Sequence, residues 1–215
     1  MKHALLTLLV LGAVAGSAAA QPYSSGPSIG IRGFGVIDAD AVAASRSFDA
    51  VFGSKQVTGA GGGVEVDVSR HLFVRVAATR IQRTGTRVFV GSGEVFPLGI
   101  ALTMTMTPLE AGGGWRFAST SRVTPYIGAA YVSLGYQETS DGAQPGENVN
   151  ERYAGAEGFG GVQVGIWKGL FAGGEVQYRH VGVPVVSTSV MSQFNENDLG
   201  GFTARVLFGF GTRPH

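Results

Sequence analysis

Hydrophobic and polar residues alternate with a period of two along much of the chain, which is the pattern of β-strands with one apolar and one polar face. Near the end of the chain, for example, Phe202 and Phe208 share a face opposite Thr203 and Arg205. The alternation is regular in five segments, at residues 64–69, 72–79, 162–167, 170–179 and 202–210. Three less regular strands are expected at residues 28–38, 98–117 and 123–137. The pattern therefore predicts an all-β fold with eight strands.

The expected strand at residues 98–117 changes phase near Pro108. Leu102 and Met106 are out of step with Leu109 and the apolar positions that follow it. An extra residue in one strand of a pair shifts the alternation in this way, and proline inside a sheet is often found at such irregularities. We therefore predict a β-bulge at Pro108.

The connections between the expected strands are alternately long and short. The long connections are residues 39–58, 84–97, 140–156 and 181–199, and the short ones are residues 70–71, 118–122 and 168–169. Outer-membrane barrels have an even number of strands, short periplasmic turns and longer external loops. A soluble barrel with its apolar face turned inward is the alternative that alternation alone leaves open. The connections favour an eight-stranded antiparallel up-and-down transmembrane β-barrel with short periplasmic turns and long extracellular loops.

Aromatic residues gather near the short connections, where a membrane barrel carries a ring of aromatic side chains at the lipid–water interface. The predicted interface residues are Trp115, Phe117, Tyr126, Trp167, Phe208 and Phe210. A second ring toward the long connections is expected from Tyr136, Tyr153, Tyr178 and Phe202. Strict alternation would turn Phe73, Trp167 and Phe171 inward, which conflicts with an interface position for Trp167.

The N-terminus has the features of a secretory signal peptide. Lys2 precedes an apolar run of about 13 residues, and Ala18 and Ala20 have the spacing that signal peptidase recognises. The run is shorter than the roughly 20 residues that a membrane-spanning helix needs, although an uncleaved anchor is the alternative. The expected organisation is a signal peptide at residues 1–20, a short lead at 21–27, the barrel at 28–211 and a tail at 212–215.

Composition narrows the possible partners. The full chain has 16 basic and 15 acidic residues, and only 14% of its residues are charged. Without a basic excess, nucleic acid is not an expected partner. There is no cysteine, so an exported chain would not be stabilised by disulfides. The hydrophobic fraction of 44% argues against reading the 35 glycines as a disordered linker.

The stretch Val-Thr-Pro-Tyr-Ile-Gly-Ala-Ala at residues 123–130 and the terminal Arg-Val-Leu-Phe-Gly-Phe at 205–210 resemble small OmpA/OmpX-type outer-membrane β-barrels. The resemblance covers the whole mature chain. It implies a monomer in the outer membrane of a Gram-negative-type bacterium, in contact with outer-membrane lipids and lipopolysaccharide. It also implies insertion with the help of periplasmic chaperones and the barrel-insertion machinery. Such barrels usually end on an aromatic residue, whereas here Phe210 is followed by five more residues.

The polar faces of the strands are expected to fill the barrel interior, since eight strands enclose a space just wide enough for side chains. The predicted lumen network is Glu65, Asp67, Arg75, Glu110, Arg116, Glu175, Gln177, Arg179 and Arg205. Glu65 and Arg75 are expected at the same height on a hairpin, where they can pair, and Glu175 and Arg205 are expected at similar heights on neighbouring strands. A satisfied polar core is favoured over a narrow ion path gated by these salt bridges, because an unpaired buried charge is very costly.

Catalysis is not expected, and no cofactor or metal site is predicted, because no metalloprotease, nucleophile-elbow or phosphate-loop motif occurs. His180 is the one histidine to weigh, with Ser187, Ser189 and Glu196 following it, because some small outer-membrane barrels are lipid A deacylases with a His/Ser pair at the rim. Asp141, Glu147 and Glu151 lack the spacing of an EF-hand calcium loop.

The predicted function is a structural or surface-interaction role in the outer membrane, carried by the extracellular loops, since loops on a rigid scaffold carry binding specificity. The loops at residues 39–58 and 140–156 are the expected contact regions for other cells, ligands or lipopolysaccharide. Arg80, Arg83 and Arg87 are weaker candidates for contact with lipopolysaccharide phosphates. The alternatives are a narrow ion or small-solute channel and, less favoured, a lipid A-modifying enzyme.

Overall fold

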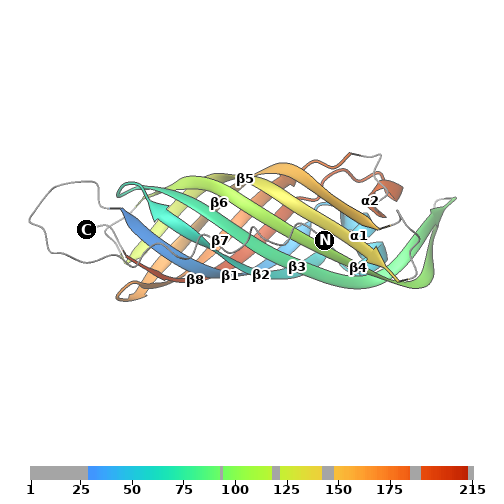
Figure 1. Ribbon diagram of the computed structural model, residues 1–215, viewed down its shortest axis with the longest axis horizontal. Coiled ribbons are helices and arrows are strands. Elements are labelled where there is room, and N and C mark those ends of the chain that lie inside the picture. Colours follow the sequence, from blue (N-terminus) through green and yellow to red (C-terminus); the bar gives the residue numbers. More distant parts are fainter. Residues whose placement is uncertain (1–28, 93, 118–121, 142–147, 185–189, 213–215) are drawn as a thin grey trace, which may run out of the picture.

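The computed structural model describes residues 29–92, 94–117, 122–141, 148–184 and 190–212, and within them the chain forms a closed barrel of eight strands (Figure 1). Each strand pairs antiparallel with the next, and β1 pairs with β8 to close the barrel. The strands are β1 (Gly30–Val42), β2 (Gln56–Asp67), β3 (Leu72–Gly91), β4 (Glu94–Arg116), β5 (Val123–Ser140), β6 (Val149–Trp167), β7 (Leu170–Val181) and β8 (Gly201–Gly211). The predicted fold class is confirmed. The expected signal peptide and lead lie outside the described residues.

Within the described residues, two short helices, which the sequence pattern did not predict, lie in the long connections. They are α1 (Ser45–Phe52) between β1 and β2, and α2 (Val190–Gln193) before β8. Both lie at the end of the barrel where the long connections gather, opposite the end of the last strand (Figure 1). Neither helix is long and apolar enough to cross a bilayer.

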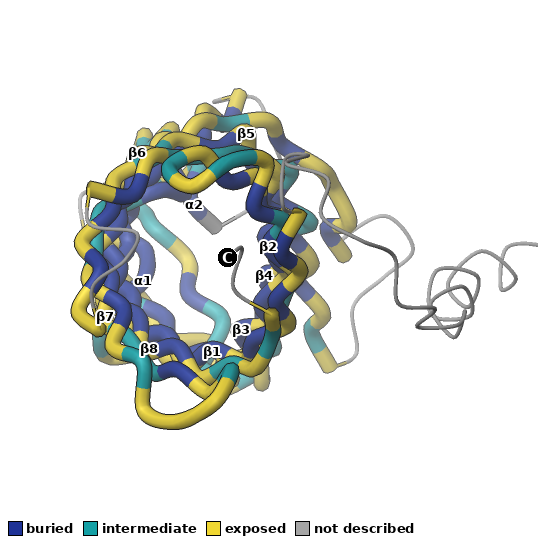
Figure 2. The backbone as a smooth tube through the Cα atoms, turned by 90° about the vertical axis from the view of Figure 1, so that its left-hand side faces the viewer, coloured by how far each residue is buried: buried dark blue, intermediate teal, exposed yellow. Residues whose placement is uncertain are grey.

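The two faces of the wall are inverted relative to a soluble protein. Val64, Val176 and Phe208 are 50%, 66% and 55% exposed on the outside. Glu65 and Glu175 are buried at 1% and 3%. Viewed along the barrel axis, buried and exposed residues alternate along the ring of strands (Figure 2). Apolar side chains on the outside and polar ones on the inside are the arrangement of a membrane barrel.

The predicted bulge at Pro108 is wrong. The pairing of β4 with β5 keeps one register from Leu102 to Arg116, through Pro108. The register shifts instead at Thr86/Val88, between β3 and β4, and at Gly165/Trp167, between β6 and β7.

The apolar residues change phase at Pro108 because they change sides of the wall. Leu109 and Trp115 point outward and are 42% and 44% exposed, whereas Leu102, Met104 and Met106 are buried inside the barrel. The strand itself continues without interruption. The two halves of β4 therefore meet different surroundings on their outer faces.

The same exchange occurs on neighbouring strands. On β3 the outward positions change from apolar Ala78 to Arg80 and Gln82. On β5 and β7 they change after Tyr131 and Tyr178, to Ser133 and His180. These positions mark the edge of the lipid-facing band, because beyond it the outer wall is polar and the interior is apolar, as in a protein surrounded by water. The barrel thus extends past the membrane at its long-loop end.

Candidate functional site

A charged cluster fills the lumen near the short-turn end. The Arg32 guanidinium donates to Asp67 Oδ1 at 2.9 Å and to the side-chain oxygen of Gln163 at 2.8 Å. Its Nη2 also lies 2.9 Å from Glu65 Oε1. The Arg116 guanidinium bridges the Glu65 and Asp67 carboxylates. Two arginines and two carboxylates therefore neutralise each other in the part of the lumen that lies within the membrane.

Aromatic rings inside the barrel lie against the arginines. The Arg75 guanidinium lies 3.9 Å from the centre of the Phe159 ring, and Arg116 lies 4.2 Å from that of Phe73. Such contacts attract a cation to the negative face of the ring. The inward-facing Gly128 makes room for Phe159, since a Cβ there would lie 2.3 Å from its ring. Alanine at this glycine position would displace the ring.

Arg205 lies at the centre of a second cluster at mid-height. Its Nε donates to Asp38 Oδ1 at 2.7 Å, and its Nη1 donates to Glu110 Oε2 at 2.8 Å. Arg179 lies beside it and donates to Glu110 Oε1 and to Glu157 Oε2, at 2.8 Å in each case. The cluster joins side chains from β1, β4, β6, β7 and β8 across the barrel axis. These contacts fill the middle of the lumen and tie distant strands together.

All nine residues of the predicted lumen network are buried inside the barrel. Glu65 lies opposite Arg75 in the β2–β3 register, as expected, but the predicted ion pair between them is wrong. Arg75 instead donates to both oxygens of Glu175, at 2.6 and 3.2 Å. Glu175 lies opposite Arg205, with a longer contact of 3.6 Å. In a closed barrel a long side chain reaches across the lumen, so register alone does not identify its partner.

Sequence reasoning missed several members of the two clusters. The missed lumen residues are Arg32, Asp38, Asp40, Thr79, Glu157, Gln163 and Thr203. On β1 the signal was present, since Arg32, Asp38 and Asp40 are all even-numbered positions on one face. Apolar Phe34 and Val36 share that face and obscure the alternation.

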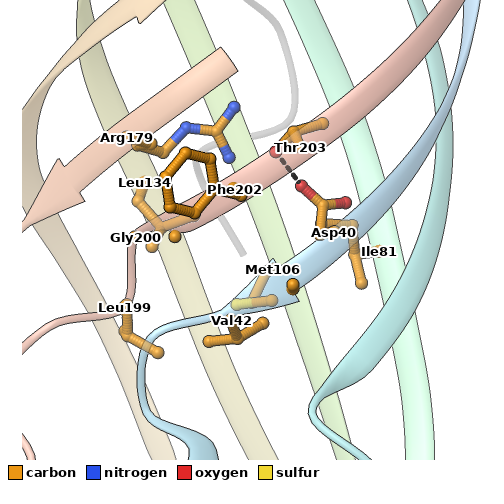
Figure 3. Close-up of a pocket in the computed structure, with 12 residues that line it drawn as sticks. Asp40, Val42, Ile81, Met106, Leu134, Arg179, Leu199, Gly200, Phe202 and Thr203 are labelled. Atoms are coloured by element: carbon orange, nitrogen blue, oxygen red, sulfur yellow. Dashed lines mark hydrogen bonds between the residues drawn. The ribbon is translucent and has the colours of Figure 1, made fainter. Parts of the chain in front are cut away.

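Above the central cluster the lumen is mainly apolar, and the buried Glu138 there accepts a hydrogen bond from the Tyr136 hydroxyl. This apolar cap consists of Val42, Ala44, Phe48, Val57, Ile81, Met104, Met106, Val132, Leu134, Tyr136, Val149, Tyr153, Val181, Val183, Met191 and Leu199. Where the cap meets the charged layer, a cavity of about 10 Å³ lies beside Asp40 and Arg179 (Figure 3). Asp40 accepts a hydrogen bond from Thr203 there, and its second carboxylate oxygen has no protein partner. The cavity has room for no more than a single water molecule.

Helix α1 closes the mouth of the barrel. Its inner face carries Phe48 and Val51, which are buried. No side chain of its own caps its first turn, but the Glu196 carboxylate accepts hydrogen bonds from the backbone N–H groups of Arg46 and Ser47, at 2.9 Å each. A carboxylate at a helix N-terminus satisfies free N–H groups and the helix dipole. Glu196 thereby links the connection between β7 and β8 to the connection between β1 and β2 through hydrogen bonds.

Five of the six residues predicted for the short-turn aromatic ring are exposed on the outer wall. Trp115, Phe117, Trp167, Phe208 and Phe210 are exposed there, with Trp167 at 76%. Trp167 faces outward, and not inward as strict alternation predicts, because the register shifts between Gly165 and Trp167. Phe73 and Phe171 do turn inward.

The prediction for Tyr126 is wrong. Its side chain is buried in the lumen, where the hydroxyl donates to Glu175 Oε2 at 2.8 Å. In the second predicted ring, Tyr178 and Phe202 lie outside with ring centres 4.9 Å apart, whereas Tyr136 and Tyr153 are buried in the apolar cap. Alternation, and not the aromatic residue type, decides whether each of these side chains faces the lumen or the outer wall.

His180 lies on the outer wall at the edge of the lipid-facing band. Its Nδ1 lies 2.8 Å from Asp198 Oδ2, and the other oxygen of Asp198 accepts from the backbone N–H groups of Val181 and Gly200. Ser187 and Ser189, the serines weighed as its partners, lie outside the described residues. Glu196 binds α1 instead. The described contacts of His180 therefore include an orienting carboxylate but no nucleophile.

The other candidate surface groups have separate positions. Arg80 is exposed on the outer wall, whereas Arg83 donates to the backbone oxygens of Phe52 and Gln56, at 3.4 Å each. Of the acidic residues in the third long connection, Glu147 lies outside the described residues. Within the described ranges, no group of three or more His, Asp or Glu side chains has the arrangement of a metal site.

Comparison with known proteins gives one family. The family model described as "Outer membrane protein beta-barrel domain" matches residues 6–210. A search of curated protein sequences finds no match.

Several solved structures have the same fold. OprG from Pseudomonas aeruginosa has a TM-score of 0.57 and 13% identity, over 86% of this chain and 95% of that one. Neisserial surface protein A has a TM-score of 0.51 and 10% identity, over 86% and 97%. Ail, the attachment invasion locus protein of Yersinia pestis, in complex with the heparin analogue sucrose octasulfate, has a TM-score of 0.50 and 11% identity, over 86% and 98%. At these identities the likeness shows the fold alone.

Proposed function

Because the chain belongs to the outer membrane protein β-barrel domain family, we propose that it is an outer-membrane barrel with a structural or surface-interaction role carried by its long-loop end. In this proposal the lumen is a filled core, and the mouth with α1, α2 and the β3–β4 hairpin faces the cell exterior. The lipids of the outer membrane, including lipopolysaccharide, surround the apolar band.

The filled lumen is the observation that carries this proposal. Two charged clusters and the apolar cap occupy the barrel in succession, and α1 lies over them. The lumen cavity between charged layer and cap measures only about 10 Å³. A conducting path needs continuous water, so the contacts favour a stabilising core over a pore.

The names of two structural neighbours support a surface role in general terms. One is called a surface protein and another an attachment invasion locus protein. Those names describe the other proteins, and here they support only the idea that loops on this fold serve contact with the surroundings.

The orientation is tested by single cysteines, since the chain has none of its own. Ser92 lies at the tip of the β3–β4 hairpin, and Lys168 lies in the short β6–β7 turn; both are exposed. We expect Ser92→Cys to react with a membrane-impermeant maleimide on intact cells, and Lys168→Cys to react only after the cells are broken. The reverse labelling pattern would overturn the proposed surface role.

The competing function is a narrow channel gated by the lumen salt bridges. It is favoured by one observation, the concentration of charged side chains along the axis. We expect no conductance steps in planar bilayers with the wild-type protein or with Arg205→Glu, because the apolar cap and α1 still block the mouth when the central charges change. Stepwise currents that differ in ion selectivity between the two proteins would replace our proposal with the channel.

A further inference from the structure

The tip of the β3–β4 hairpin leaves the barrel wall. The pairing of β3 with β2 ends at Ile81, and that of β4 with β5 ends at Leu102. Past the register shift at Thr86/Val88, β3 and β4 pair only with each other within the described residues. We call residues 88–91 and 94–100 the ribbon. Its β4 edge carries backbone C=O groups and, except at Pro97, N–H groups that no described strand covers.

The ribbon exposes large apolar side chains. Phe89 and Phe96 lie opposite each other and are 56% and 47% exposed, and Val95 and Leu98 are 42% and 48% exposed. Glu94 is the only charged residue between positions 88 and 100. Unlike the apolar band of the wall, this surface combines exposed rings with an uncovered sheet edge.

The ribbon lies outside the protein's own membrane. The outer wall becomes polar at Arg80, 11 positions before Gly91, which corresponds to about 36 Å along a strand at about 3.3 Å per residue. Even with a tilt of about 35–45°, the ribbon rises well above the lipid-facing band. It also projects farther than the other strands at the end of the barrel where α1 and α2 lie (Figure 1). Lipid therefore does not explain the exposed rings, and such a patch indicates a binding surface.

The ribbon is held in place at its base. Val88 is buried against Val51 of α1 and Leu102 of β4. Its position therefore depends on the closed mouth, and a partner would meet an ordered strand with little ordering cost.

Charge narrows the choice of partner. Anionic lipid headgroups and polyanions are recognised by clusters of lysine and arginine, which the ribbon lacks. An uncovered strand edge with apolar side chains is matched by another extended strand of the same kind, through backbone hydrogen bonds and side-chain contacts. The ribbon of a second copy has both properties and the same near-neutral charge.

We propose that the ribbons of two copies pair edge to edge, antiparallel, and so join two apposed membranes. Antiparallel neighbours in a sheet are related by a two-fold axis perpendicular to the sheet. At the barrel wall this axis lies in the membrane plane, so it turns the second barrel to face the first. A two-fold axis along the membrane normal would instead cross the two strands at about 80°, twice the usual tilt, and prevent pairing. The contact therefore acts between membranes.

Each pairing is weak on its own. Two short edges with a few apolar side chains bury less than the roughly 1,200 Å² at which stable interfaces begin. Many copies on two facing surfaces strengthen the contact through effective concentration. Membrane joining should therefore rise steeply with the density of the protein.

The test uses two populations of vesicles, labelled with donor and acceptor dyes and carrying the full chain, with outward orientation verified by labelling of Ser92→Cys. We expect density-dependent clustering and energy transfer when both populations carry the wild type. Phe96→Lys in both populations should slow clustering at least tenfold, because it places like charges in the contact. Gln82→Lys adds the same charge to an exposed position of β3, below the ribbon, and should leave clustering unchanged.

Folding of every variant is verified by heat-dependent gel migration, and Phe89→Lys provides a second variant if Phe96→Lys does not insert. Clustering of wild-type vesicles with protein-free vesicles would identify lipid as the partner and overturn the proposal. So would an absence of clustering at all densities, or equal clustering by the ribbon variants. The inference rests on the proposed outward orientation, and maleimide labelling on cells tests that orientation separately.

Discussion

Replacing Arg205 by leucine is expected to lower the free energy of unfolding by about 3–5 kcal/mol, the usual effect of removing one partner from a buried ion cluster. Arg205 is 1% exposed and bonds to Asp38 and Glu110 through three nitrogen atoms. Leucine fills part of the volume but leaves the buried Asp38 carboxylate without its arginine, and leaves Glu110 with Arg179. Urea unfolding from lipid vesicles, followed by tryptophan fluorescence, measures the loss.

Two further variants separate the charge effect from a general sensitivity to mutation. Arg70→Leu removes an exposed arginine near the short β2–β3 turn and should change stability by no more than about 0.5 kcal/mol. Adding Asp38→Asn to Arg205→Leu should recover part of the loss, because it removes the carboxylate that has lost its arginine partner. If Arg205→Leu is as stable as the wild type, the central cluster does not hold the lumen together as described.

Phe48→Ala is expected to release α1 from the barrel mouth, with a loss of about 3–5 kcal/mol in the free energy that holds the helix in place. Phe48 is 1% exposed within the apolar cap, and its ring centre lies 5.3 Å from that of Phe52. Because a tenfold change corresponds to about 1.4 kcal/mol, amide hydrogen exchange across residues 45–52 should accelerate at least about hundredfold. Exchange in β1 and β8 should change much less, since their pairing does not involve α1.

Asp49→Ala is the matched control, because Asp49 is exposed on the same helix and its side chain does not face the cap. This variant should keep slow exchange in α1. Equal acceleration in both variants would mean that the effect is not specific to the Phe48 side chain. Unchanged exchange in Phe48→Ala would mean that packing in the apolar cap does not hold α1 in place.

The number of strands, their antiparallel order and the polarity of the lipid-facing wall could be predicted, because alternation reports directly which residues share a face. The phase change on β4 was wrongly interpreted as a bulge. A bulged strand and a regular strand that passes from lipid into water both move the apolar residues to the other face, so the two give the same sequence pattern. The pairing of β4 with β5 distinguishes these two cases, because its register passes through Pro108 without a shift.

The lumen contacts were harder to predict than the lumen residues. Every residue named for the network lies inside, yet Arg75 pairs with Glu175, 100 positions away, instead of its neighbour across the hairpin. Which acid an arginine meets depends on the diameter and shear of the closed barrel, and alternation carries neither quantity. Helix α1 was missed because eight residues give too little periodicity, and its cap, Glu196, is supplied from 150 positions away.

The exchange of polarity along the wall also fixes the depth at which the barrel sits. A shift toward the exterior by one residue pair would bring Leu109 and Tyr131 into water, and a shift inward would draw Arg80 and Thr107 into hydrocarbon. Both displacements are unfavourable, so the molecule resists sliding along the membrane normal. In a bilayer of different thickness, the surrounding lipids rather than the barrel would have to adjust, by thinning or thickening around it.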